Sequence, residues 1–243
     1  MSAVDEWHAL GAFTPARLAL GRAGNGLPTS RVLEFQLAHA RARDAVNAPF
    51  DAEAIAAALP PSVVLATQAK DRAAYLRNPD LGRRLDAASR AALVPGAYDA
   101  VLVVADGLSS TAIHAHGAAL AKAIRAQTPD TRWAPTAVVR HGRVAAGDEI
   151  AQALGAAFAV VLIGERPGLS AADSVGLYLT LRPVAGVSRD AERNCISNVR
   201  PGGLGLDEAA HRLAWLMATA RRLGATGVAL KEDAPESVTD ARG

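Results

Sequence analysis

The stretch AAFAVVLIGERPG, residues 156–168, decides the fold of this chain. Residues 157–163 are apolar without interruption, and a short run of this kind is typical of a strand buried on both faces of a sheet. Gly164 then frees the backbone, the opposite charges of Glu165 and Arg166 follow, and a Pro-Gly pair predicts a turn. A charged turn after a buried parallel strand lies where open α/β sheets bind ligands. The alternative is an ordinary loop whose two charges pair with neighbours.

Strands and helices alternate around this stretch. Their order is that of a βαβαβ unit, so the pattern predicts an α/β fold with a parallel sheet and right-handed crossovers. Two further short strands and a final amphipathic helix follow the unit. The strands are predicted at residues 98–105, 136–140, 157–163, 177–182 and 195–199, and the helices at residues 109–127, 148–154 and 207–223.

The part of the chain before this unit has a different pattern. Turn-forming residues make residues 1–28 irregular, and the segments after them favour helices. Helices are predicted at residues 29–47, 51–59, 71–76 and 81–93, with a short strand at residues 62–67. We therefore expect a mainly helical N-terminal region, residues 1–95, followed by a sheet-containing domain, residues 96–243.

The composition excludes several classes of protein. Of the 243 residues 50% are hydrophobic but only 4% are aromatic, so the core must consist mostly of Ala, Val and Leu. The net charge of +2 comes without a basic tract, which argues against a nucleic-acid partner. No apolar run is long enough to span a membrane. A single cysteine, Cys195, and an N-terminus without a secretion signal are typical of a cytoplasmic protein.

Polar loops follow the three strands of the βαβαβ unit. They are residues 106–110, 141–144 and 164–168, and the topology places them at one edge of the sheet. Together they could line a crevice that holds a nucleotide-like or other polar cofactor. Each of them, taken alone, is also compatible with ordinary turn chemistry.

Familiar catalytic and metal-binding patterns are missing. The glycine fingerprints of NAD and ATP sites are absent. His114 and His116 lie roughly 200° apart around a helix, so they cannot share a metal ion. Cys195 has no histidine nearby to activate it, and we expect it to be a small buried side chain. The sequence therefore predicts no catalytic residue and no metal ligand, as in a subunit that shares a cofactor with a partner.

Several motifs together resemble one known family, the small (light) subunit of ethanolamine ammonia-lyase. The resemblance covers about residues 14–223, and the spacing of GERPG and CISN makes it specific. The matching segments are TPARL at 14–18, FQLAHARARDAV at 35–46, PDLGRR at 79–84, DGLS at 106–109, IGERPG at 163–168 and NCISNV at 194–199.

The resemblance implies an adenosylcobalamin-dependent lyase. In this family the enzyme converts ethanolamine into acetaldehyde and ammonia through radicals. The large (heavy) subunit is a barrel that holds the substrate, and the small subunit contributes a Rossmann-like domain that covers the cobalamin from the other side. The resemblance therefore implies a Rossmann-like sheet, a hetero-oligomer and no acid–base chemistry on this chain.

The resemblance also implies three cofactor contacts, at Val144, Glu165 and Cys195. A carboxylate such as Glu165 can accept N–H groups from the amide side chains on the corrin rim, with charge assistance. Backbone groups of Val144 and Cys195 can bond the remaining amides or the nucleotide tail. Cys195 would then be a contact without a redox role.

Two absences refine what the resemblance implies. The motif Asp-x-His-x-x-Gly, with which some cobalamin domains replace the cofactor's own base by histidine, is missing, so we expect that base to stay on cobalt. Some relatives carry a long N-terminal extension linked to packaging in a bacterial microcompartment, whereas about a dozen residues precede the match here. Packaging therefore stays open. The rival interpretations are a stand-alone corrinoid-binding or cofactor-chaperone protein and a nucleotide-dependent enzyme.

Overall fold

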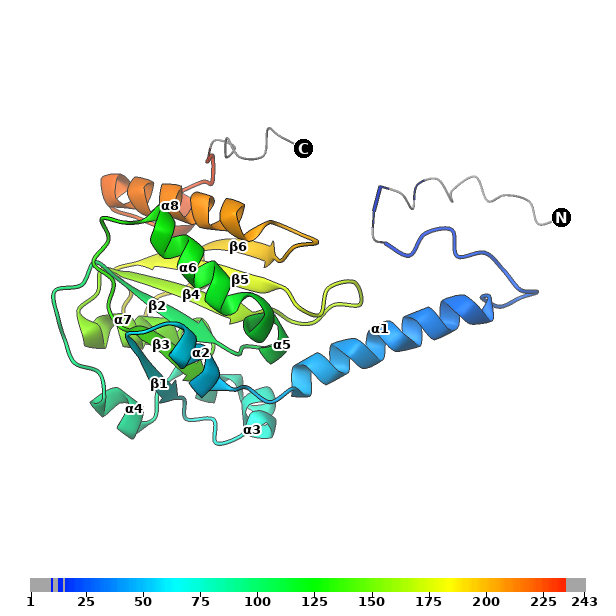
Figure 1. Ribbon diagram of the computed structural model, residues 1–243, viewed down its shortest axis with the longest axis horizontal. Coiled ribbons are helices and arrows are strands. Elements are labelled where there is room, and N and C mark those ends of the chain that lie inside the picture. Colours follow the sequence, from blue (N-terminus) through cyan, green and yellow to red (C-terminus); the bar gives the residue numbers. More distant parts are fainter. Residues whose placement is uncertain (1–9, 11–12, 15, 235–243) are drawn as a thin grey trace.

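A six-stranded sheet forms the centre of the computed structural model, which describes residue 10, residues 13–14 and residues 16–234. The strand order is β1-β3-β2-β4-β5-β6 (Figure 1). All residues of β2 and β4 are buried, as expected for strands inside a sheet covered on both faces. The strands are β1 (Ser62–Ala66), β2 (Ala100–Ala105), β3 (Thr136–Arg140), β4 (Phe158–Gly164), β5 (Val175–Leu181) and β6 (Asn194–Val199).

The sheet is mixed rather than wholly parallel. Strands β1, β3, β2 and β4 are parallel to their neighbours, whereas β5 is antiparallel to β4 and β6 is antiparallel to β5. The predicted α/β class is confirmed, and so are the positions of the strands. The antiparallel pair was not predicted. It arises because residues 165–174 connect β4 to β5 without a helix, and a parallel return needs a longer crossover.

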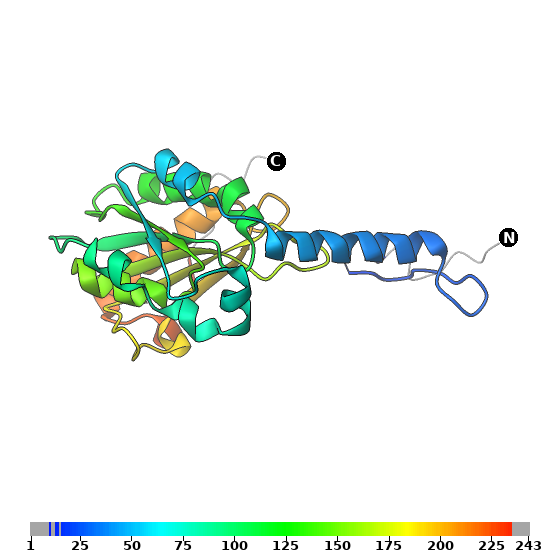
Figure 2. The same cartoon turned by 90° about the horizontal axis from the view of Figure 1, so that it is seen from below.

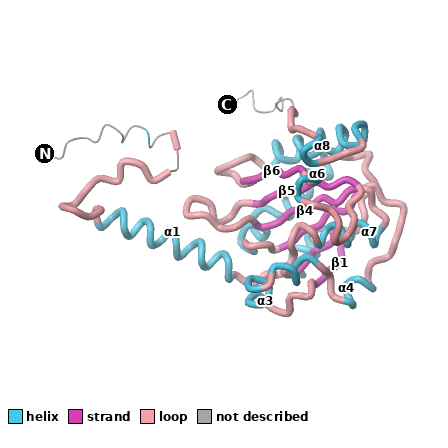
Figure 3. Tube along the Cα trace, turned by 180° about the vertical axis from the view of Figure 1, so that it is seen from behind, coloured by secondary structure: helices cyan, strands magenta, loops and turns pink. Residues whose placement is uncertain are grey.

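Helices cover both faces of the sheet. Residues of α2, α6 and α8 build the core on one face, and residues of α7, with Leu85 and Leu93, build the core on the other (Figure 3). The helices are α1 (Thr29–Asn47), α2 (Ala52–Ala58), α3 (Arg72–Arg77), α4 (Ala87–Ala91), α5 (Ser110–Ala112), α6 (Ala118–Gln127), α7 (Ala146–Leu154) and α8 (Leu206–Leu223). None of the helices in the described ranges is long and apolar enough to cross a membrane.

Two predicted helices are interrupted. The helix expected at residues 81–93 is instead a 3-10 turn, Pro79–Arg83, and the short α4, because Leu85 forms a bridge with Thr67 between them. The helix expected at residues 109–127 contains a π-helical segment, Ile113–Gly117, between α5 and α6. There His114 accepts a hydrogen bond from the backbone N–H of Asp51 at 3.0 Å.

The helix α1 projects away from the rest of the molecule (Figure 2). Of its residues only Ala45, near the C-terminal end, is buried. Leu33 and Leu37, which lie on one stripe of the helix, are 58% and 52% exposed. The body of this chain therefore leaves most of α1 uncovered.

The division of the chain at about residue 95 stays a prediction. The region before it is largely helical, yet it also provides β1, which pairs in parallel with β3 from the region after it. The helix α2 also contributes Ala52 and Ile55 to the core that α6 and α8 form on one face of the sheet.

Candidate functional site

Three loops meet at the carboxyl edge of the parallel strands and line one pocket. The pocket has a volume of about 400 Å³. This confirms that the loops after β2, β3 and β4 lie together, as the topology predicts. The pocket is lined by Tyr75, Gly107, Leu108, Arg143, Val144, Ile163, Gly164, Glu165, Arg166 and Tyr178.

Two glycines allow the first and third loops to approach each other. Gly107 has φ = +54°, and a Cβ atom there would lie 2.3 Å from the side chain of Ile163. A Cβ atom on Gly164 would lie 2.1 Å from the backbone oxygen of Ser109. The backbone N–H of Leu108 donates to the oxygen of Gly164 at 2.8 Å. Larger residues at either glycine would force the two loops apart.

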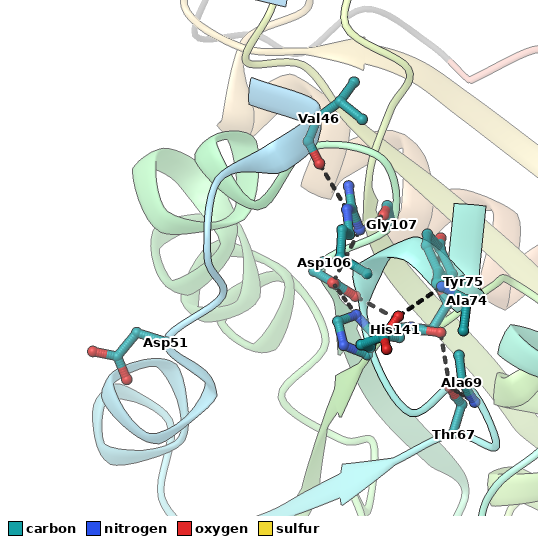
Figure 4. A network of polar contacts seen from close by, with 12 residues as sticks. Val46, Asp51, Thr67, Ala69, Ala74, Tyr75, Asp106, Gly107 and His141 are labelled. Atoms are coloured by element: carbon teal, nitrogen blue, oxygen red, sulfur yellow. Dashed lines mark hydrogen bonds and ion pairs between the residues drawn. The ribbon is translucent and has the colours of Figure 1, made fainter. Parts of the chain in front are cut away.

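A buried carboxylate, Asp106, ties these loops to the N-terminal region (Figure 4). Its side chain is 1% exposed and lies 3.3 Å from both Nη1 of Arg72 and Nδ1 of His141. Arg72 also donates to the backbone oxygens of Val46 and Gly107, each at 2.7 Å. The cluster therefore connects the end of α1, helix α3 and the loops after β2 and β3.

The aromatic ring of Tyr75 supports the second loop. Its hydroxyl donates to the backbone oxygen of Gly142 at 3.0 Å. The guanidinium carbons of Arg143 and Arg72 lie 4.4 Å and 5.1 Å from the ring centroid, which gives two cation–π contacts. Burial raises the pKa of Tyr75, so its phenol remains a neutral donor. Tyr75 thus fixes both the loop backbone and the Arg143 side chain.

The structure brings two of the three proposed contact residues together. Val144 and Glu165 line the same pocket, and both are partly exposed. One carboxylate oxygen of Glu165, Oε2, accepts a hydrogen bond from the backbone N–H of Asn198 at 3.2 Å. Asn198 has φ = +57° and lies near the end of β6, so Glu165 ties the loop after β4 to that strand. Its other oxygen has no protein partner among the described residues and can accept a hydrogen bond from a ligand.

Cys195 lies beside this pocket rather than in its lining. Tyr178, which lines the pocket, is paired with Val161 of β4 on one side and with Cys195 of β6 on the other. Burial, followed by a hydrogen bond with Cys195, raises the pKa of Tyr178. Cys195 is therefore the strand neighbour of a residue that lines the pocket with Val144 and Glu165.

The expectation that Cys195 is buried is wrong. The residue is exposed, because β6 is an edge strand of which only Ile196 and Val199 are buried in the core. Its Sγ atom lies 3.3 Å from Oγ of Ser197, which has the same exposed character. Exposure leaves the thiol available for a contact with a ligand or with another chain.

A second hollow is lined by residues before β2, at the start of α7 and after β5. Its volume is about 480 Å³, and its lining includes Arg83, Arg84, Arg90 and Asp148. Asp148 is 1% exposed and accepts two hydrogen bonds of 2.6 Å from Arg193. Burial alone would lower the pKa of Arg193, but the carboxylate raises it, so the guanidinium stays charged. This hollow is larger than the first pocket, but none of the predicted contact residues lines it.

The sequence did not indicate several residues of the first pocket. Tyr75 belongs to the N-terminal region, and no local pattern places it beside the loop after β3; the same holds for Arg72, which contacts Tyr75 and Asp106 without lining the pocket. Tyr178 belongs to a predicted strand whose antiparallel partners were unknown. Arg143 lies in the predicted loop at residues 141–144, but only its neighbour Val144 was expected to contact the cofactor. Among the described residues no group of three or more His, Cys, Asp or Glu side chains could hold a metal ion.

Comparison with known proteins decides the family. The family model of the ethanolamine ammonia-lyase light chain (EutC) matches residues 4–231. The chain belongs to the ethanolamine ammonia-lyase light chain family. This confirms the resemblance carried by GERPG and CISN, and it makes the chain a subunit of a lyase.

Individual relatives support the same family assignment. A protein of Ralstonia nicotianae named ethanolamine ammonia-lyase small subunit is 52% identical over 251 residues, which cover 98% of this chain and 92% of that protein. The protein of the same name from Pseudomonas fluorescens is 49% identical, with 97% of this chain and 90% of that protein covered. A third, from Xanthomonas campestris, is 50% identical, with 95% and 89% covered. The similarity to light chains of the family thus extends over nearly the full length of both partners in each comparison.

Proposed function

We propose that this chain is the small subunit of an adenosylcobalamin-dependent ethanolamine ammonia-lyase and that it binds the cofactor jointly with a large catalytic subunit. The observation that carries the proposal is the pocket at the carboxyl edge of β2, β3 and β4. It contains two of the positions at which the family resemblance implies cobalamin contacts, Val144 and Glu165. The third, Cys195, is exposed on the adjoining strand.

The residues present fit a corrinoid. A cobalamin has a flat apolar macrocycle, a rim of amide side chains and a nucleotide tail. The pocket offers apolar contacts from Leu108, Val144 and Ile163 and polar groups from Glu165 and Tyr178. A whole cobalamin is larger than this pocket of about 400 Å³, so part of the cofactor would lie outside it. A second subunit could contact that part.

Each contact residue has a definite task in this proposal. Glu165 accepts rim amide N–H groups through the oxygen that Asn198 leaves free. Val144 and Cys195 offer small side chains and backbone groups beside it. Tyr178, held neutral by its raised pKa, is a further donor on the same surface. Adenosylcobalamin supplies the radical chemistry by which ethanolamine becomes acetaldehyde and ammonia, and this chain positions the cofactor and excludes water from it.

The partner in this proposal is the large (heavy) subunit, which holds ethanolamine. Such a partner is supported by the relatives, which are named small subunits. The projecting helix α1 (Figure 2) supports it too, because Leu33 and Leu37 are largely exposed on one stripe of it. A cytoplasmic enzyme, either free or inside a bacterial microcompartment, remains our prediction for its location.

The experiment that tests the proposal is reconstitution with the large subunit. The chain is co-expressed with it, and ethanolamine deamination and cobalamin binding are measured for the wild type, Glu165→Ala and Glu165→Gln. We expect an active complex that binds cobalamin, with affinity reduced about 10-fold or more in Glu165→Ala, since a charge-assisted hydrogen bond is lost. Glu165→Gln keeps a hydrogen-bond acceptor and should lose less.

The same experiment distinguishes the proposal from its rival interpretation. A stand-alone corrinoid-binding or cofactor-chaperone protein would bind cobalamin tightly without the large subunit and would not form a stoichiometric complex with it. Unchanged cobalamin affinity in Glu165→Ala, with the complex intact, would contradict the role of this pocket.

A further inference from the structure

The pocket contains two arginines without a carboxylate partner. Neither Arg143 nor Arg166 forms an ion pair with a described residue. Arg143 is partly buried, and its Nε atom is buried without a hydrogen-bond partner. Arg72, Arg125 and Arg193 also have a buried guanidinium nitrogen without a partner, so this feature alone does not indicate a ligand. Arg143 differs from them because it lines the pocket without a carboxylate partner, and a guanidinium in such a position can pair with an anionic ligand.

Arg143 is also held in place before any ligand binds. Its guanidinium stacks over the ring of Tyr75 at 4.4 Å, and its backbone N–H donates to the oxygen of Gly82 at 2.7 Å. The ring of Tyr75 is itself anchored by the bond from its hydroxyl to Gly142. Stacking leaves the edge of a guanidinium free, and that edge matches an anion with two oxygen atoms. Arg166, by contrast, is exposed and has no anchoring contact.

The proposed cofactor carries one group that fits such a cation. The amides on the corrin rim are neutral, and the phosphodiester of the nucleotide tail is the anion among the peripheral groups of a cobalamin. The one acidic side chain of the pocket, Glu165, makes no ion pair with Arg143 and is bonded to Asn198 instead. Within the pocket, Glu165 is therefore available as a hydrogen-bond acceptor for the rim amides, and Arg143 is available as a donor to an anion.

We propose that Arg143, stacked on Tyr75, binds the phosphodiester of the cobalamin nucleotide tail and thereby selects a complete cobalamin over a corrinoid without the tail. This inference rests on the proposed function, since it names the part of the cofactor that one side of the pocket recognises. Arg143 is a binding residue in this account and takes no part in the chemistry of ethanolamine.

The test compares two corrinoids on the co-expressed complex of this chain with the large subunit. Hydroxocobalamin carries the nucleotide tail, whereas cobinamide has the same corrin without the phosphodiester and the terminal base. Dissociation constants for both are measured by absorbance titration, which does not depend on activity. The variants are Arg143→Gln, Arg143→Lys and the control Arg77→Gln, which removes a charge from the exposed surface of α3.

The expected result is a selective loss. Arg143→Gln should weaken hydroxocobalamin binding about 10- to 100-fold, the range for a charge-assisted hydrogen bond, with cobinamide affinity unchanged. Arg143→Lys keeps the charge and the aliphatic stem, so it should fold like the wild type and lose less. Arg77→Gln should change neither affinity.

Each other outcome overturns the inference. If Arg143→Gln weakens both corrinoids equally, the residue acts on the corrin or on the fold. If it weakens neither, or if the wild-type complex binds cobinamide as tightly as hydroxocobalamin, no tail phosphate is recognised by Arg143. A wild-type complex that binds neither corrinoid contradicts the proposed function itself, and a complex that binds both but ignores Arg143 contradicts this inference alone.

Discussion

Asp106 and Gly142 join two loops of the pocket: Oδ1 of Asp106, after β2, accepts a hydrogen bond of 3.2 Å from the backbone N–H of Gly142, after β3. The other oxygen, Oδ2, faces Arg72 and His141 at 3.3 Å. One buried carboxylate therefore holds the backbone that leads into Arg143 and Val144. Through Arg72, which donates to Val46, the same carboxylate is linked to the end of α1.

The first prediction concerns this carboxylate. Asp106→Ala should lower the free energy of unfolding by about 3–5 kcal/mol, because it leaves the buried guanidinium of Arg72 without its charge partner and a buried N–H without an acceptor. Asp106→Asn keeps an acceptor for Gly142 and should cost less. Urea denaturation of both variants measures the difference, and equal losses would mean that the bond to Gly142 does not contribute.

The buried pair of Asp148 and Arg193 gives a second prediction. Arg193→Met should destabilise the chain by about 3–5 kcal/mol, because it leaves a carboxylate buried without its partner. The double variant Arg193→Met with Asp148→Leu removes both charges and should recover most of that loss. Thermal unfolding of the two single variants and the double variant gives the coupling. Simple additivity of the two single losses would contradict a direct pairing.

A third prediction follows from the pKa of Asp99. Hydrogen bonds from the side chain and backbone of Arg132 lower this pKa to about 2. Since the pKa in the unfolded chain is about 3.9, the pair stabilises the fold above pH 4 and loses this effect as the pH falls towards 2. Asp99→Asn should therefore be less stable than the wild type at pH 7, with a smaller difference at pH 3. A difference independent of pH would show that the charge of Asp99 does not contribute.

The fourth prediction concerns the exposed stripe on α1. Leu33→Ser with Leu37→Ser should weaken association with the large subunit while leaving the unfolding transition of the isolated chain unchanged, since both side chains are exposed in it. Analytical ultracentrifugation of mixed subunits measures the association. The matched control is Val187→Ser, another exposed apolar residue, on the loop after β5. Unaltered association in the double variant would remove α1 from the interface.

Patterns in the sequence predicted those parts of the fold that local chemistry determines. The unbroken apolar run of residues 157–163 became the fully buried β4, and the Asp106-Gly107 and Gly164-Glu165 turns lie at one edge of the sheet. The antiparallel β5 and β6 could not be predicted, because pairing direction depends on how the chain returns over residues 165–174.

The site was predictable where neighbouring strands share an edge and not where distant segments fold back. Val144 and Glu165 belong to loops of the βαβαβ unit, so the topology places them together. Tyr75 reaches the pocket only because α3 packs beside the loop after β3, where its hydroxyl bonds Gly142. No periodicity in the sequence encodes such a long-range contact, and the exposure of Cys195 likewise depends on β6 being an edge strand.

The most direct test of the central claim is a crystal structure of this chain in complex with the large subunit and cyanocobalamin. We predict that the corrinoid lies against the loops after β2, β3 and β4, in contact with Val144, Glu165 and Cys195, with the large subunit enclosing its other face. A corrinoid bound wholly within the large subunit, with this edge of the sheet facing solvent, would contradict the account.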